Sequence, residues 1–198
     1  MNSLSSELDG DELLHLALKA SEEQKTDEAI KFLKNLLEKK PNNGKAWYFL
    51  GALHAEIGLY DRAIIEMEKA VKLDADLYAA HFQLGLLYIT SGRVEESINA
   101  WKPLDILGPE SPLNLFRSGL INLANDNFDQ CIVDLTKGIA LNTSNKPMNK
   151  DMQGIIELAK SALEKKATES SQVDRDDKKN KNHHIFLTAY QDGDKKDN

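Results

Sequence analysis

The chain has 198 residues, of which 41% are hydrophobic and 29% are charged, and its formal net charge is −7. These numbers suit one packed domain of ordinary size with a well-solvated surface, and the negative charge argues against a nucleic-acid-binding protein. The single cysteine, Cys131, excludes a disulfide within the chain and suits a reducing compartment.

We expect residues 1–9 to form a flexible N-terminus. This end of the chain has no basic start and no unbroken apolar core, so it does not resemble a secretory signal. No run anywhere in the sequence approaches the roughly 20 apolar residues of a membrane span. The sequence therefore predicts a cytoplasmic protein that does not insert into a membrane.

Amphipathic helical patterns follow one another from residue 11 onwards. Residues 26–39, for example, place Ala29 and Leu33 on one face, and Ser111–Pro112 is typical of a helix start. Pro103 lacks the amide proton that a helix interior needs, so it should kink the last turn of its helix. The predicted helices span residues 11–22, 26–39, 45–57, 61–73, 77–90, 94–107, 112–124 and 128–141.

Small residues recur in these helices with a period of 34. Glycine inside a helix costs about 1 kcal/mol relative to alanine, so we expect Gly51 to face Ala63 on the next helix and let the two backbones approach closely. A fixed period of this length indicates a stacked array of helix pairs. The small positions are Ala17, Gly51, Gly85 and Gly119 on the first helices, and Ala29, Ala63, Ser97 and Cys131 on the second.

The repeated residues resemble the tetratricopeptide repeat (TPR). Residues 47–75 match its pattern best, with Trp47, Gly51 and Tyr60 in their expected places, and residues 81–109 come next. The resemblance implies an all-α fold, a right-handed superhelical solenoid of antiparallel helix pairs whose concave face recognises proteins. It covers four repeats, over residues 10–43, 44–77, 78–111 and a degenerate 112–145.

The chain after the repeats divides into a helix and a tail. Residues 146–167 predict one more amphipathic helix, about the ninth, which has no partner and suits the capping of a repeat array. Residues 168–198 are polar and charged, so we expect them to be largely disordered. Within them, residues 185–190 form a short apolar segment.

No catalytic motif is present, and we expect no enzyme activity, cofactor or metal site. Cys131 occupies a small packing position, and His54 and His81 stand where aromatic residues stand in other repeats, so packing roles are favoured for all three. His183–His184 with Asp192 and Asp194 could bind a metal weakly, although a solvated tail is the favoured interpretation.

The TPR resemblance implies a peptide groove lined by the first helix of each pair, at fixed offsets from its small residue. Leu14, Leu18 and Ala52 replace the Lys and Asn residues of the subset that grips a C-terminal carboxylate, so we expect no such clamp. Part of the apolar stripe could instead be ordinary packing between helices. The candidate groove residues are Leu14, Leu18, Lys45, Tyr48, Ala52, Phe82, Leu86, Ile89, Phe116, Arg117, Leu120 and Leu123.

A contiguous apolar stripe of this kind predicts a protein-interaction module, a TPR adaptor or chaperone-like protein that binds an apolar peptide or helix. The bulk of Tyr48, Phe82 and Phe116 predicts that these rings stay exposed as anchors. Two alternatives remain open at this point. The groove could hold residues 185–190 of its own or a neighbouring chain, giving autoinhibition or a homodimer, or the protein could resemble a bacterial secretion chaperone.

Overall fold

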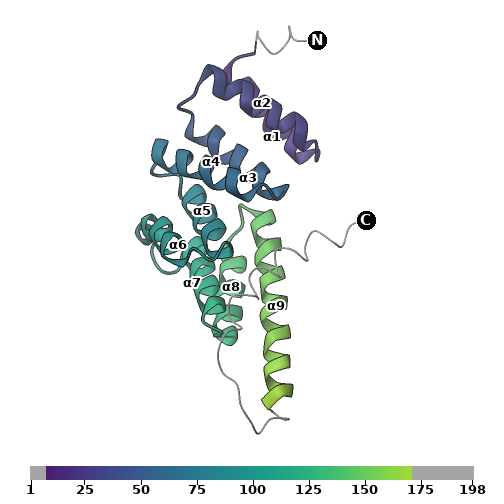
Figure 1. The fold of residues 1–198 in the computed structure, drawn as a ribbon, viewed down its shortest axis with the longest axis vertical. Helices are drawn as coiled ribbons and strands as arrows, with labels where there is room; N and C mark the ends of the chain where they lie inside the picture. The colour runs from purple at the N-terminus through teal and green to yellow at the C-terminus, as the bar shows by residue number, and fades with distance from the viewer. Residues whose placement is uncertain (1–7, 171–198) are drawn as a thin grey trace. The chain divides into compact units, whose positions relative to one another are not determined.

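The computed structural model describes residues 8–170, and this part of the chain is built from helices joined by short turns, with no strand in it (Figure 1). The fold is therefore all-α. The helices are α1 (Gly10–Glu22), α2 (Thr26–Lys39), α3 (Gly44–Glu56), α4 (Tyr60–Leu73), α5 (Tyr78–Thr90), α6 (Val94–Trp101), the 3-10 helix η1 (Lys102–Leu107), α7 (Pro112–Ala124), α8 (Phe128–Leu141) and α9 (Lys146–Ser170).

The helix boundaries follow the sequence closely. Helices α2, α7 and α8 have their predicted bounds, and the ends of α1, α3, α4 and α5 lie within one residue of prediction. The predicted helix 146–167 runs on to Ser170, and the predicted helix 94–107 is α-helical only to Trp101 and continues as η1. Pro103 accounts for this change because it cannot donate to the helix ladder.

The turn inside each helix pair repeats with the same period as the small residues. Gln24, Gly58, Gly92 and Asp126, spaced by 34 residues, all have positive φ, between 58° and 77°. Glycine adopts this conformation without strain, whereas the side chains of Gln24 and Asp126 occupy it at some cost. A residue with positive φ therefore stands at the same place in the turn of each of the four helix pairs.

The described residues form two compact units: residues 8–89 with 94–103, and residues 90–93 with 104–170. In the first unit, α1 packs on α2, α3 packs on α4, and α5 is joined to α6 where the Trp101 Nε1–H donates to the Phe82 carbonyl oxygen at 3.0 Å. In the second unit, α7 packs on α8, and α8 packs on α9.

Small residues allow close packing inside these pairs, as the period predicts. A Cβ on Gly51 would lie 3.2 Å from the carbonyl oxygen of Ala63, so these two positions do face each other. Each pair also buries one large residue at a common register, at most 1% exposed: Leu33, Met67, Trp101 and Leu135. The apolar core of each unit is thus built from residues at equivalent positions of successive helix pairs.

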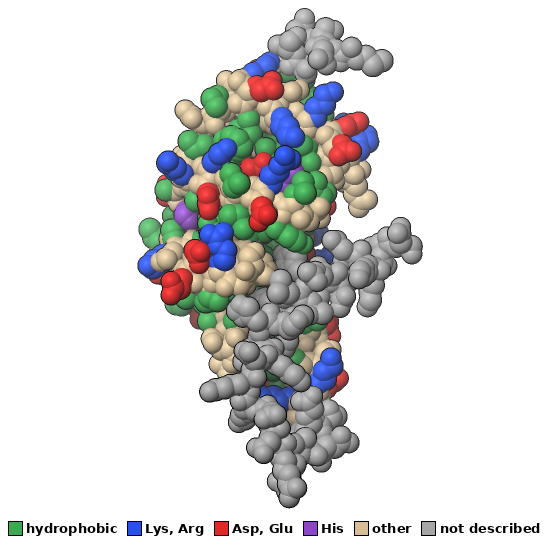
Figure 2. Space-filling view, viewed as in Figure 1, with side chains coloured by type: hydrophobic (Ala, Val, Ile, Leu, Met, Phe, Trp, Pro, Cys, Tyr) green, Lys and Arg blue, Asp and Glu red, His purple; other side chains and the backbone are tan. Residues whose placement is uncertain are grey.

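The surface agrees with the high charged content of the sequence. Lys and Arg side chains are interspersed with Asp and Glu over the face of the described residues that Figure 2 shows. Among the helices described, none combines the length and the hydropathy that crossing a membrane requires.

Candidate functional site

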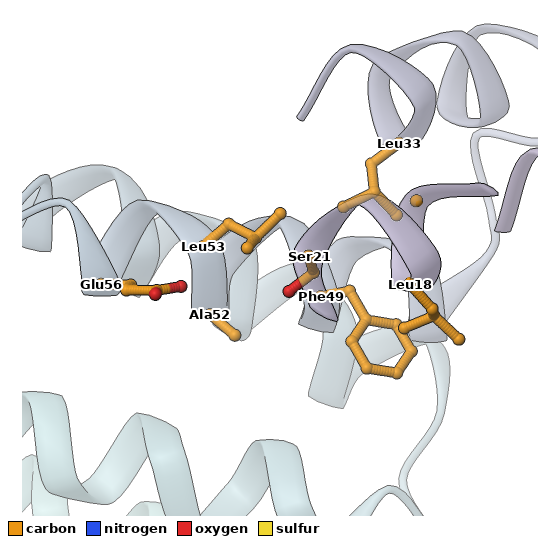
Figure 3. Close-up of a pocket in the computed structure, with 8 residues that line it drawn as sticks. Leu18, Ser21, Leu33, Phe49, Ala52, Leu53 and Glu56 are labelled. Carbon is orange, nitrogen blue, oxygen red and sulfur yellow. The ribbon is translucent and has the colours of Figure 1, made fainter. Parts of the chain in front are cut away.

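The first unit contains an open pocket of about 120 Å³ between α1, α2 and α3 (Figure 3). The space exists because Ala17 and Ala52 present only methyl groups where a larger side chain would fill it. The residues lining the pocket are Ala17, Leu18 and Ser21 on α1, Leu33 on α2, and Phe49, Ala52, Leu53 and Glu56 on α3.

The floor and the walls of the pocket differ in burial. Leu33 and Leu53 are buried and belong to the core of the first unit, whereas Leu18 and Phe49 are only partly buried. Leu18 and Phe49 lie together at one end, and Glu56 lies at the other (Figure 3). The cavity is therefore apolar, with a rigid floor and walls that solvent can reach.

Two polar groups stand at its edge. The Glu56 carboxylate is exposed and the Ser21 hydroxyl is partly buried. Within residues 8–166, neither side chain forms a hydrogen bond or an ion pair. Both groups are thus available to a ligand, one as a charged acceptor and the other as a donor or acceptor.

The predicted groove residues of α1 and α3 lie on or beside this pocket. Leu18 and Ala52 line it, Leu14 is partly buried against the same core, and Lys45 is exposed one turn before Phe49. Tyr48 packs against the core of α4 and α5, and burial raises the pKa of its hydroxyl. These residues of α1 and α3 are therefore at least partly accessible, and their role in binding stays a prediction.

The expectation that Phe82 and Phe116 remain exposed is wrong, because both rings are 0% exposed. The indole of Trp101 stacks on Phe82 with ring centroids 6.2 Å apart, and Phe116 fills the space that Gly138 leaves on α8, where a Cβ would lie 2.5 Å from the ring. Their neighbours are buried as well, between 0% and 4% exposed: Leu86, Ile89, Leu120 and Leu123.

Arg117 is partly buried and its guanidinium donates to the Asp105 carboxylate at 2.7 Å. We predicted Arg117 at the edge of a groove, but its ion pair with Asp105 instead connects α7 to η1. Asn114 makes the same connection, because its amide donates to the carbonyl oxygens of Leu104 at 2.7 Å and Gly108 at 2.8 Å.

Sequence reasoning missed Phe49 and Glu56 as pocket residues. The signal was present, because Lys45, Phe49, Ala52 and Glu56 follow one another by four, three and four residues, a spacing that places them on one face of a helix. The predicted offsets were counted from the small residue of each first helix, and on α3 they gave Tyr48 and Ala52 but not Phe49 or Glu56. They therefore selected the neighbouring stripe through Tyr48.

The buried histidines have structural partners. His54 Nδ1 lies 2.6 Å from Glu66 Oε2, and both side chains are buried between α3 and α4. The ring nitrogens of His81 lie 3.1 Å from the Ala100 carbonyl oxygen and 3.2 Å from that of Ala75. The described residues contain no group of three His, Cys, Asp or Glu side chains that could hold a metal, and His183–His184 with Asp192 lies outside them.

Cys131 is buried at the small position of α8. Burial, assisted by the negative charge of Asp134, raises the pKa of its thiol from 9.0 to about 12. The thiolate is the reactive form of cysteine, so this side chain is inert at neutral pH.

Repeated helix pairs of this kind define a helical-repeat fold. Residues 20–76 match the family model of the tetratricopeptide repeat. Residues 20–76 of the chain therefore carry tetratricopeptide repeat sequence.

Solved structures share the fold at low sequence identity. TTC0263, a thermophilic TPR protein of Thermus thermophilus, is 16% identical with a TM-score of 0.62, over 92% of this chain and 97% of its own. YrrB, a TPR protein with an unusual peptide-binding site, is 14% identical with a TM-score of 0.54, and the match covers 93% of this chain and 86% of YrrB. The structure of the APC/C hetero-tetramer Cut9–Hcn1 is 17% identical with a TM-score of 0.63, and the match covers 94% of this chain and 37% of that chain. These similarities establish the fold alone, and no curated protein sequence matches the chain.

Proposed function

We propose that this protein is a non-enzymatic TPR adaptor that binds an apolar segment of a partner protein at the pocket between α1 and α3. The observation that carries the proposal is an open apolar cavity with Leu18 and Phe49 as accessible walls. Its volume of about 120 Å³ approaches the roughly 150 Å³ of an apolar cavity that holds benzene. It therefore suits one large apolar side chain.

The pocket alone does not supply micromolar affinity. Burial of one apolar side chain contributes about 1.5–3 kcal/mol, whereas micromolar binding needs about −8 kcal/mol and ordering a flexible peptide costs about 2–5 kcal/mol. Additional contacts must come from residues outside the pocket, such as the partly buried Leu14 on α1 and Tyr48 on α3. We therefore propose a weak, reversible interaction with an extended footprint.

The fold supports this kind of function. Among the proteins that share it, YrrB has a peptide-binding site, and Cut9 and Hcn1 assemble into a hetero-tetramer. A cytoplasmic location and a chaperone-like role belong to the same proposal, and the single cysteine, buried as a thiol, favours a reducing compartment.

Self-association is the second candidate, because the chain carries its own apolar segment at residues 185–190. That segment lies outside the described residues. An isolated peptide of this sequence that competes with a bound partner at the pocket would favour the second candidate over the first.

The test is selection of displayed random peptides on the full chain, followed by affinity measurement with the variant Leu18→Gln. Leu18 lines the pocket without belonging to the buried core, so the variant removes an apolar wall and leaves the fold intact. We expect peptides with large apolar residues, bound at least tenfold more weakly by the variant. The matched control is Ile65→Gln, an exposed isoleucine on α4, which should bind as the wild type does. Equal loss in both variants would contradict the proposal.

A further inference from the structure

The pocket between α1, α2 and α3 has an acidic end. Glu56, the last residue of α3, lines it at the end opposite Leu18 and Phe49 (Figure 3). No lysine, arginine or histidine is among the described residues that line it. Glu22, the last residue of α1, directly follows the lining residue Ser21. Both first helices that form the pocket therefore end in a carboxylate.

This acidic position is found only in the two repeats whose first helices form the pocket. Glu22, Glu56, Thr90 and Ala124 are spaced by 34 residues and are therefore equivalent. The two glutamates are exposed, so the packing of the repeat does not require an acid at this position. The charge therefore follows the pocket and not the repeat.

Neither carboxylate is neutralised within residues 8–166. Glu22 and Glu56 make no ion pair or hydrogen bond there, whereas the neighbouring Glu23 accepts from the Lys25 ammonium at 2.7 Å. Their place in the helices adds to the negative charge, because the carbonyl groups at a helix end favour basic residues. A cation supplied by a ligand would therefore remove an unfavourable charge at this end of the pocket.

We propose that the pocket binds an apolar segment that carries a lysine or arginine beside its apolar anchor. The anchor fills the space at Leu18 and Phe49, and the basic side chain reaches the Glu56 carboxylate, with the Ser21 hydroxyl as a second acceptor. The long stem of the basic residue lies on the apolar wall while its charged group stays in water, so it can approach from either side of the anchor. This inference rests on the proposed function and specifies the partner as basic.

The direct test uses three labelled probe peptides with the same Leu-Phe centre. Two lysines, two serines or two aspartates stand on each side of that centre, so the direction of the bound peptide does not matter. Fluorescence anisotropy with the full chain should show the lysine peptide bound about twofold to fivefold more tightly than the serine peptide, because an exposed ion pair contributes modestly. The aspartate peptide should bind most weakly, and added salt should reduce the differences. Equal affinity for the three peptides at low salt would overturn the proposal.

A matched pair of variants separates the pocket from the charge of the whole molecule. The chain has a net charge of −7, which attracts a lysine peptide to any part of its surface. Glu56→Gln removes one negative charge at the pocket, and Glu38→Gln removes the same charge at an exposed position on α2. The first variant should lose most of the preference for lysine over serine, and the second should keep it. The same preference in both variants would refute the role of Glu56.

A second readout does not depend on binding. Because a helix end disfavours an acid, Glu56→Gln should melt at the same temperature as the wild type or slightly higher. A lower melting temperature would mean that Glu56 stabilises the free protein, which would contradict its role as a group that awaits a cation.

The variant Leu18→Gln distinguishes failure of this inference from failure of the adaptor function. If the three peptides bind equally well and all require Leu18, the adaptor function stands and the basic partner is wrong. If no peptide binds, or if binding does not depend on Leu18, both the adaptor function and the basic partner are wrong.

Discussion

At the scale of single residues, two polar pairs lie at the same register of different repeats, the first buried and the second partly buried. His54 and Glu66 join α3 to α4, and 68 residues later Asn122 donates to Asp134 at 3.0 Å and joins α7 to α8. Removing His54 leaves the buried Glu66 without this partner, which costs about 1–3 kcal/mol. Asp134 also accepts from Ser118 and Gln130, so the loss of Asn122 should cost less. The sequence did not reveal these pairs because the residue one repeat after His54 is Tyr88, which favoured an aromatic packing role for His54.

Cys131 gives the first residue-scale prediction, a component of alkaline unfolding. The folded chain keeps the thiol proton up to about pH 12, whereas the unfolded chain loses it near its ordinary pKa of 9.0. Between these values the folded state binds more protons, so stability is complete below pH 9 and falls as the pH rises. The free energy of unfolding should decrease by up to about 1.4 kcal/mol per pH unit from this group.

Urea unfolding at pH 8, 9 and 10 under reducing conditions measures that slope. The matched variant is Cys131→Ala, because alanine occupies the same register at Ala29 and Ala63. Lysines and tyrosines titrate equally in both proteins, so only the difference in slope reports the thiol. The same slope in wild type and variant would show that the thiol pKa is not raised.

At the scale of helices, the glycines fall into two kinds that the sequence alone does not separate. A Cβ on Gly85 would collide with the indole ring of Trp101, which is fully buried, whereas a Cβ on Gly154 in α9 would meet no atom within 4 Å. Gly85→Ala should therefore destabilise the protein by about 1–3 kcal/mol through overpacking. Gly154→Ala should stabilise it by about 1 kcal/mol, because alanine favours the helix.

Thermal or urea unfolding of the two single variants decides this prediction. Gly51→Ala is the intermediate control, because its Cβ would lie 3.2–3.3 Å from its nearest neighbours and needs only a small adjustment. Its change in stability should lie between the other two. Stabilisation by Gly85→Ala would mean that Trp101 can move away from α5.

At the scale of the whole molecule, sequence was a better guide to the array than to its binding surface. The 34-residue period determined the helix pairs and their turns because each repeat uses the same small positions. The accessible surface depends on the partners of those positions, and these partners vary. Trp101 replaces Met67 and covers Phe82, while Gly138 takes the place of a larger residue and admits Phe116. Fixed offsets from the small residue take no account of these substitutions, so they could not predict that Phe82 and Phe116 are buried.

The pocket illustrates the same limit. Leu18 and Ala52 were predicted from the repeat offsets, but the pocket lies between Ala17, at the small position that every repeat shares, and Ala52, where the next first helix carries a leucine. In the next repeat along the chain, the residues equivalent to these two are Gly51 and Leu86, and Leu86 is buried. A local exception to the repeat, rather than the repeat itself, creates the candidate site.

The last helix gives the final prediction, because an array of repeats exposes an apolar face wherever it stops. Helix α9 packs on α8 and buries Met148, Met152 and Ile156. A chain ending at Asn145 lacks these side chains and leaves the facing surface of α8 in water. At about 1.5–3 kcal/mol for each large apolar side chain, the loss should lower the melting temperature, increase binding of an apolar dye and promote association.

A chain ending at Ser170 is the control, since it retains every helix described here. It should melt and bind dye as the full chain does. If the chain ending at Asn145 also behaves as the full chain does, the contact between α8 and α9 contributes little to folding. In that case exposure of the apolar face of α8 to water would not destabilise the fold, and α9 would not act as the cap of the array.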